Sequence, residues 1–128
     1  MPIKSMLLVA SGGAVGALLR YLMTSGISFW MGRDFPYGTI TVNIAGSFLI
    51  GMFTTVLCQN AMEPQLKLLL ITGLLGGFTT FSTFSLDTIN LIASGCWLKT
   101  FFYIAGSLIL SLTATFAGIA MGSAIKAG

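Results

Sequence analysis

Residues 73–85 read GLLGGFTTFSTFS, and they lie inside an apolar segment that extends from about 66 to 94. A glycine pair followed by two threonines is a poor helix interior, because glycine has a low helix propensity and threonine is stiff at χ1. The segment is also longer than the roughly 20 residues that a straight helix needs to cross a bilayer. We therefore predict a transmembrane helix that is broken near its middle, with an unwound turn at mid-depth.

Three further apolar segments surround this one, and they cover residues of about 5–30, 37–59 and 98–124. Each is long enough to cross a bilayer. The connections are short and contain turn or breaker residues such as Gly32, Pro36 and Gly95, so no soluble domain fits between the segments. We predict an all-α membrane protein with four transmembrane helices, which form a single transmembrane domain over residues 1–128.

The composition agrees with a membrane protein and excludes several functions. Charged residues make up 7% of the 128 residues, against roughly 25% in a soluble domain, and apolar residues make up 55%. There is no His, and the three acids lie far apart, so the usual parts of an acid–base, triad or metal-hydrolytic site are missing. The basic residues are isolated, which disfavours nucleic acid as a partner. We predict that the chain is not an enzyme.

The basic residues do not select one orientation in the membrane. With four crossings, the two sides carry Lys4, Lys67 and Lys126 against Arg33, Lys99 and, if it snorkels that way, Arg20. The positive-inside rule needs a basic excess on one side, and here the excess is nearly zero. We predict insertion in both orientations and an antiparallel, dual-topology homodimer around an in-plane two-fold axis. The alternative is that another factor fixes one orientation and that any dimer is parallel.

Polar and small residues recur every four positions in the second and fourth segments. These are Thr39, Asn43, Ser47, Gly51 and Thr55 in the second, and Lys99, Tyr103, Ser107, Ser111 and Thr115 in the fourth. Such stripes also occur where helices pack closely and where hydroxyls bond to their own backbone. Tyr103 and Asn43 are not small, however, and both are costly to leave unpaired in hydrocarbon. The stripes therefore predict a hydrated or ion-lined path.

The first segment carries Gly12, Gly16 and Arg20 at the same spacing. Gly12 and Gly16 form a GxxxG pattern, which is typical of close helix packing. A charge at the position of Arg20 costs at least ~2.5 kcal/mol on insertion scales, so its side chain should face protein, water or an interface. Two interpretations stay open: Arg20 supplies positive potential near a pore mouth, or it only snorkels.

A break in the third segment would free backbone carbonyls, which protein, water or ions must satisfy. In an inverted dimer, carbonyls of both chains would converge on one cation at the two-fold axis. Beyond the break, Phe81 and Phe84 can present the positive edges of their rings to a small anion, although packing is the plainer interpretation of such a pair. Donors for that anion would come from Asn43, Ser82 and Thr83. Asp87 would lie near the helix end or pair with a base such as Arg20.

These motifs together resemble the Fluc (CrcB) family of fluoride channels. The similarity covers all four segments. It is carried by GGFTTFSTF at 76–84, by Gly38, Thr39, Asn43, Gly46, Ser47 and Phe48, by Gly13, Gly16 and Arg20, and by the Tyr-x3-Ser-x3-Ser-x3-Thr ladder that starts at Tyr103.

The resemblance implies a dual-topology dimer in the bacterial plasma (inner) membrane, with two antiparallel fluoride pores and a structural sodium ion at the dimer centre. By motif position, the sodium ligands would be the backbone carbonyls of Gly76 and Thr79. The pore would be lined by the rings of Phe81 and Phe84, the amide of Asn43, and the polar track of Tyr103, Ser107, Ser111 and Thr115.

The physics of fluoride suits such a lining. Moving a small anion out of water costs on the order of tens of kcal/mol by Born reasoning, so donors must replace its hydration shell. Neutral donors can do this and still release the ion, whereas a fixed base deep in the path would hold it. Neutral HF enters cells and ionises in a less acidic cytoplasm. A passive anion path driven by the negative inside potential would then export fluoride and protect the cell from its toxicity.

Two other functions stay open at this point. A small multidrug-type proton antiporter also has four spans and dual topology, but it needs a central carboxyl, usually in the first span, where this chain has none. Asp87 is the only acid inside a predicted span. The third possibility is an accessory membrane subunit with no transport of its own.

Overall fold

The computed structural model describes residues 2–58 and 64–128, and within these ranges all regular structure is helical. Four helical stretches are long and apolar enough to cross a membrane: Ile3–Met31, Tyr37–Leu57, Pro64–Ala93 and Trp97–Ala127. This confirms the prediction of an all-helical chain with four such helices. The predicted end of the second segment, residue 59, lies outside the described residues.

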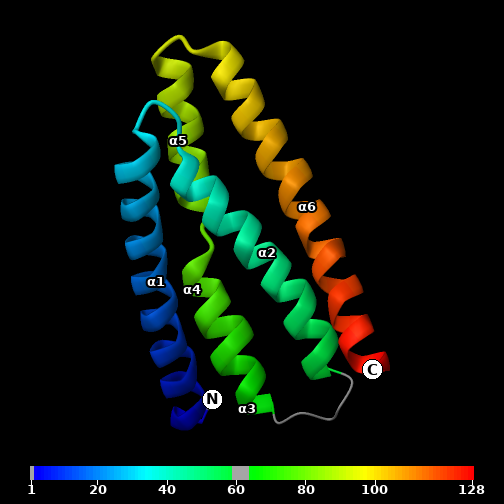
Figure 1. Ribbon diagram of the computed structural model, residues 1–128. Helices are drawn as coiled ribbons and strands as arrows, with labels where there is room; N and C mark the ends of the chain where they lie inside the picture. The colour runs from blue at the N-terminus through cyan, green and yellow to red at the C-terminus, as the bar shows by residue number, and fades with distance from the viewer. Residues whose placement is uncertain (1, 59–63) are drawn as a thin grey trace.

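The chain runs through its helices in a simple up-and-down order (Figure 1). The elements are α1 (Ile3–Met31), α2 (Tyr37–Cys58), α3 (Pro64–Lys67), the π-helical η1 (Leu68–Leu75), α4 (Gly76–Phe78), α5 (Phe81–Ala93) and α6 (Trp97–Ala127). The third apolar segment is thus built from four short elements in succession, whereas each of the other three is one continuous helix.

Both ends of the chain lie at one end of the bundle (Figure 1). The connections α1–α2 and α5–α6 lie at the opposite end, where Lys99 Nζ donates a hydrogen bond to the Asp34 carbonyl oxygen at 3.4 Å. Each connection turns at a glycine in the left-handed region, Gly32 with φ 89° and Gly95 with φ 75°. Other residue types rarely adopt this backbone conformation, so glycine makes these short reversals possible.

Close backbone contacts join neighbouring helices. α2 packs along α6, and α1 packs against η1 and α4 and also against α2. A Cβ at Gly51 would overlap the Thr115 carbonyl oxygen, and one at Gly16 would overlap the Leu74 carbonyl oxygen. Gly12 and Gly16 are the buried residues of α1, so the GxxxG pattern is used for helix packing.

Most large apolar side chains point away from the protein. The side chains of Phe29, Phe116 and Leu112 are among the exposed ones. In each of the four membrane-length helices, no more than 17% of an apolar 18-residue stretch is buried. In water such a surface would be strongly unfavourable, because each exposed Å² of apolar area costs about 25 cal/mol. Lipid or another copy of the chain is the natural environment for this surface.

Candidate functional site

The backbone leaves helical geometry at Thr79 and Thr80, between α4 and α5. Thr79 has φ −89° and ψ 158°, and Thr80 has φ −153° and ψ 116°, so both residues are extended. Gly76 and Gly77 stay helical in α4. In the Gly-Gly-Phe-Thr-Thr sequence that predicted a break, the helix is therefore interrupted at the two threonines, whereas the two glycines are helical.

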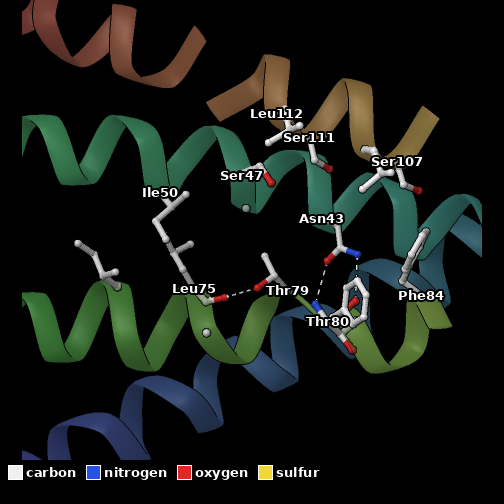
Figure 2. A pocket seen from close by; sticks show the side chains of 15 residues that line it. Asn43, Ser47, Ile50, Leu75, Thr79, Thr80, Phe84, Ser107, Ser111 and Leu112 are labelled. Carbon is white, nitrogen blue, oxygen red and sulfur yellow. Dashed lines mark hydrogen bonds between the residues drawn. The ribbon is translucent and has the colours of Figure 1, made fainter. Parts of the chain in front are cut away.

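Asn43 of α2 binds the extended backbone with both ends of its side-chain amide (Figure 2). Its Nδ2 donates to the Thr80 carbonyl oxygen at 3.0 Å, and its Oδ1 accepts from the Thr80 N–H at 2.8 Å. The amide therefore satisfies both polar groups of one residue, as a neighbouring strand would. Asn43 was predicted as a pore amide, and this arrangement leaves one of its two amide hydrogens for a further acceptor.

The Thr80 hydroxyl caps the start of α5. Its Oγ1 accepts from the Thr83 N–H at 3.1 Å and donates to the Thr83 hydroxyl at 3.1 Å, with the Ser82 hydroxyl at 3.3 Å. Ser82 and Thr83 are thus gathered around one hydroxyl at a helix N-terminus. Thr80 was not predicted as a site residue, although a threonine at the start of a helix is a recognisable N-cap signal.

Arg20 of α1 contacts the same interrupted segment. Its Nε donates to the Gly77 carbonyl oxygen at 3.1 Å. Together with Thr80 and Thr83 it also lines a cavity of about 330 Å³. Arg20 therefore faces protein and a cavity that several threonines line.

The partner of Asp87 of α5 is a tyrosine, whereas the sequence suggested a base such as Arg20. It accepts a hydrogen bond from the Tyr103 hydroxyl at 3.0 Å. The contact fixes Tyr103, which is fully buried, and it was not predicted from the sequence.

These side-chain contacts take N–H groups away from two backbone carbonyls. In a continuous α-helix, the N–H of each residue bonds to the carbonyl four residues earlier. The Thr80 N–H would then bond to the Gly76 carbonyl, and the Thr83 N–H to the Thr79 carbonyl. Here the first N–H bonds to the Asn43 side chain and the second to the Thr80 hydroxyl. The Gly76 and Thr79 carbonyl oxygens therefore keep acceptor capacity beside the interruption.

A cavity of about 410 Å³ lies next to the interrupted segment (Figure 2). Its polar lining consists of Asn43, Ser47, Thr79, Thr80, Ser107 and Ser111, and its aromatic lining of Phe81 and Phe84. No charged side chain lines it. The rest of the lining is mainly aliphatic, from Ile50, Ile71, Leu75, Leu108 and Leu112. The cavity is thus largely apolar, with a few neutral hydroxyl and amide groups between α2, α6 and the third segment.

Ser107 is the most informative residue of this cavity. Its side chain is 7% exposed, and its Oγ has no hydrogen-bond partner within residues 2–58 and 64–128. Other hydroxyls of these helices bond to carbonyls of their own helix, as Thr55 does to the Gly51 carbonyl at 2.8 Å. A buried hydroxyl without a partner costs about 1–3 kcal/mol, so Ser107 is a candidate donor to a ligand or water.

The two predicted stripes serve two purposes. Asn43, Ser47, Ser107 and Ser111 line the cavity. Further along, the Thr115 hydroxyl lies 3.1 Å from the carbonyl oxygens of both Ser47 and Ser111, so it joins α2 to α6. Close packing thus explains the stripes at Thr115, and a cavity lining explains their middle part.

The aromatic rings form a contiguous group. The ring centroids of Phe81 and Phe84 are 5.5 Å apart, and those of Phe84 and Tyr103 are 5.2 Å apart. Phe81 is 75% exposed and Tyr103 is fully buried, so the group extends from the outer surface of this chain to its core. One side of the cavity therefore opens at Phe81, on the surface that lipid or a second copy would cover.

Comparison with known proteins agrees with the sequence resemblance. A family model described as CrcB-like protein, Camphor Resistance (CrcB), matches residues 7–119. A protein of Magnetococcus marinus is 44% identical over 118 residues, which are 91% of this chain and 96% of that protein. One of Rhizobium etli is 50% identical over 121 residues, 93% and 96% of the two chains. One of Flavobacterium psychrophilum is 48% identical over 117 residues, 91% and 94%. Each is named fluoride-specific ion channel FluC.

Proposed function

The chain belongs to the CrcB-like protein family, and from this premise we propose that it is a fluoride-selective ion channel and not an enzyme. Relatives that align with 91–93% of its length carry the name of fluoride-specific channels. With four helices apolar enough to cross a membrane, it is a multi-pass membrane protein. Its function would be the passive export of cytoplasmic fluoride, which protects the cell against fluoride toxicity.

The observation that carries the proposal is the unpartnered Ser107 hydroxyl in a cavity without charged lining. Ser107 lines this space, and a neutral donor there can replace water around an anion without trapping it. The neighbouring Ser111 hydroxyl and the second amide hydrogen of Asn43 would add two further donors. An antiporter would need a free carboxyl in this place, whereas Asp87 is bound to Tyr103 and does not line the cavity.

We assign the fluoride path to the predicted residues in three groups. Ser107, Ser111 and Asn43 would donate hydrogen bonds to the ion, and Phe81 and Phe84 would present ring edges to it. Ser82 and Thr83 would supply hydroxyls at the start of α5. Tyr103, whose hydroxyl donates to Asp87, and Thr115, whose hydroxyl joins α2 to α6, would mark the two ends of the polar track without donating to the ion. Arg20 would give the entrance a positive potential.

The proposed assembly is an antiparallel, dual-topology homodimer in the bacterial inner membrane. Two features support it. The basic residues at the two ends of the bundle are nearly equal in number, so neither orientation is favoured. The cavity opens beside the 75% exposed ring of Phe81, which a second copy would cover. In the membrane, residues Pro64–Ala93 would form one crossing that is interrupted near its middle at Thr79 and Thr80.

A sodium ion at the centre of the dimer fits the residues that are present. The Gly76 and Thr79 carbonyl oxygens lack the N–H partners that a continuous helix would give them, and interrupted membrane helices use such carbonyls to bind Na⁺. These two residues of each copy would hold the ion. When bound, the ion would supply positive charge that satisfies the carbonyls and joins the two interrupted backbones.

The test is potassium-driven efflux from liposomes that contain only the purified chain, with fluoride compared with chloride. We expect rapid fluoride efflux and at least about tenfold slower chloride efflux, a preference of about 1.4 kcal/mol or more. The variant Phe81→Ile removes a ring from the cavity and should slow fluoride. The matched control is Phe116→Ile, because Phe116 is similarly exposed, at 74%, but does not line the cavity.

Two outcomes would contradict the proposal. Equal efflux of the two halides would remove the fluoride assignment. No efflux at all from liposomes with correctly inserted protein would instead indicate an accessory subunit.

A further inference from the structure

Two side chains bind backbone N–H groups at the interruption. The Asn43 amide oxygen holds the Thr80 N–H at 2.8 Å, and the Thr80 hydroxyl holds the Thr83 N–H at 3.1 Å. Each of these N–H groups is the one that a continuous helix would direct to a carbonyl named above as a sodium ligand, the first to Gly76 and the second to Thr79.

We propose that Asn43 and Thr80 are positioning residues for the cation site. By withholding two N–H donors, they keep the Gly76 and Thr79 carbonyl oxygens available to a small monovalent cation. Neither side chain needs to touch the ion, because each acts through the backbone group that it binds. This inference rests on the proposed function, and in particular on the cation at the dimer centre.

A hydrogen bond to the Gly77 carbonyl supports the proposal that only some backbone carbonyls are available to the cation. Gly77 lies between the two ligand positions in α4 and the interruption, but its carbonyl oxygen accepts a hydrogen bond from Arg20 Nε at 3.1 Å. A carbonyl that already accepts from a charged guanidinium is a poor cation ligand, because the positive charge of the guanidinium repels the ion. The side chains around the interruption therefore occupy the Gly77 carbonyl and leave the Gly76 and Thr79 carbonyls without their helical N–H partners.

The positions of the two residues argue against simple helix capping as their only role. A cap for α5 requires the Thr80 hydroxyl and nothing from α2. Asn43, however, reaches the interruption from α2 and bonds to both backbone groups of Thr80. It also lines the cavity with Ser107 and Phe84, so one amide contacts both the candidate fluoride path and the backbone of the candidate cation site.

The experiment is a sodium titration of the purified chain in detergent, with N-methylglucamine replacing sodium at constant ionic strength. A ligand that binds only the folded state raises the thermal unfolding midpoint as its concentration increases, so the titration gives an apparent sodium affinity. A purely structural cap would lower the unfolding midpoint at every sodium concentration and leave the sodium affinity unchanged. The two roles are thus separated by one data set.

Thr80→Val removes the hydroxyl at constant shape, whereas Thr80→Ser keeps it. We expect Thr80→Val to weaken the apparent sodium affinity by about tenfold, which is the lower end of the effect of groups that support metal ligands. The sodium affinity of Thr80→Ser should stay within about twofold of that of the unaltered chain. Asn43→Ser, whose side chain is too short to reach the Thr80 N–H, should also weaken it by about tenfold. It provides an independent test if Thr80→Val does not fold.

The matched control is Thr88→Val. The Thr88 hydroxyl lies on the same helix, α5, and bonds to the Phe84 carbonyl oxygen at 2.8 Å. Its loss removes a hydroxyl of the same kind without changing an N–H at the interruption, so we expect no change in sodium affinity.

The inference is overturned if Thr80→Val and Asn43→Ser both bind sodium as the unaltered chain does, or if Thr80→Ser loses as much affinity as Thr80→Val. If the unaltered chain shows no response to sodium, the cation site and this inference fail together. Fluoride efflux by the same preparation would still decide the channel proposal separately.

Discussion

Replacing Ser107 by alanine separates a permeation role from a structural role at one atom. The Ser107 Oγ is buried and has no hydrogen-bond partner among the described residues. The substitution therefore removes no hydrogen bond of the protein. A serine that mattered only for folding would have to contribute through such a bond, so stability and transport should respond in opposite ways.

The expected magnitudes follow from this geometry. An unpartnered buried hydroxyl costs about 1–3 kcal/mol, and alanine is the better helix former, so Ser107→Ala should leave stability unchanged or raise it. A hydrogen bond to an ion contributes about 1.5–3 kcal/mol. If the loss falls on the permeation barrier, fluoride transport slows by at least about tenfold, because 1.36 kcal/mol corresponds to a factor of ten in rate.

Both quantities can be measured on the same preparation. Thermal unfolding in detergent reports stability, and fluoride efflux from liposomes with few proteins per vesicle reports the transport rate. The matched control is Thr100→Val, because Thr100 is a similarly buried residue of α6 whose hydroxyl bonds to the Cys96 carbonyl oxygen at 2.8 Å. The control should lower the unfolding midpoint slightly and leave the efflux rate within about twofold.

The opposite pattern would exclude a permeation role for the Ser107 hydroxyl. If Ser107→Ala lowers the unfolding midpoint and transports fluoride at the unaltered rate, the hydroxyl has a structural role and the cavity does not conduct through it.

Three further predictions follow from the packing and the topology. Gly118→Val should cost about 1–3 kcal/mol or more of unfolding free energy, because its Cβ would overlap the Phe48 carbonyl oxygen. Gly26→Ala, with open space around it, should leave the unfolding midpoint unchanged or raise it. Asp87→Asn keeps an acceptor for the Tyr103 hydroxyl, so electrogenic fluoride efflux should persist, and a complete loss would instead favour an antiporter. With Cys58 replaced by Ser, a membrane-impermeant maleimide should label Cys96 on about half of the chains in sealed vesicles and on nearly all after permeabilisation, since the charge balance favours neither orientation. Labelling of all or none before permeabilisation would show a single orientation.

The four helices were predictable because the physical signal is strong and local. A run of some 20 apolar residues without charges has few alternatives to a membrane helix. Helix ends were less predictable. The first helix begins at Ile3 and the last ends at Ala127, beyond the predicted 5–30 and 98–124, because hydrogen bonding continues after the apolar stretch ends.

The glycine pair shows where propensity fails as a guide. Glycine disfavours a helix by about 1 kcal/mol, yet Gly76 and Gly77 are helical. A Cβ at Gly77 would collide with the Gly13 carbonyl oxygen of α1, so this glycine permits close packing of α4 on α1. The extended residues follow it at Thr79 and Thr80, where Asn43 supplies the hydrogen bonds that a helix would have made.

The candidate site was only partly accessible from the sequence. Spacing places Ser107, Ser111 and Thr115 on one face of a helix, but it cannot say which of them faces a cavity and which faces another helix. Small polar residues suit both uses, and only the register of α2 against α6 separates Ser107 from Thr115. The contact between Asn43 and Thr80 joins residues 37 positions apart, which periodicity within one helix does not encode.

The central claim is that neutral hydroxyl and amide donors conduct fluoride in preference to other anions. Its most direct test is the reversal potential of the unaltered chain in a planar bilayer, with opposite gradients of fluoride and chloride. We expect a current that reverses close to the fluoride equilibrium potential. Reversal near the chloride potential, or midway between the two, would contradict it.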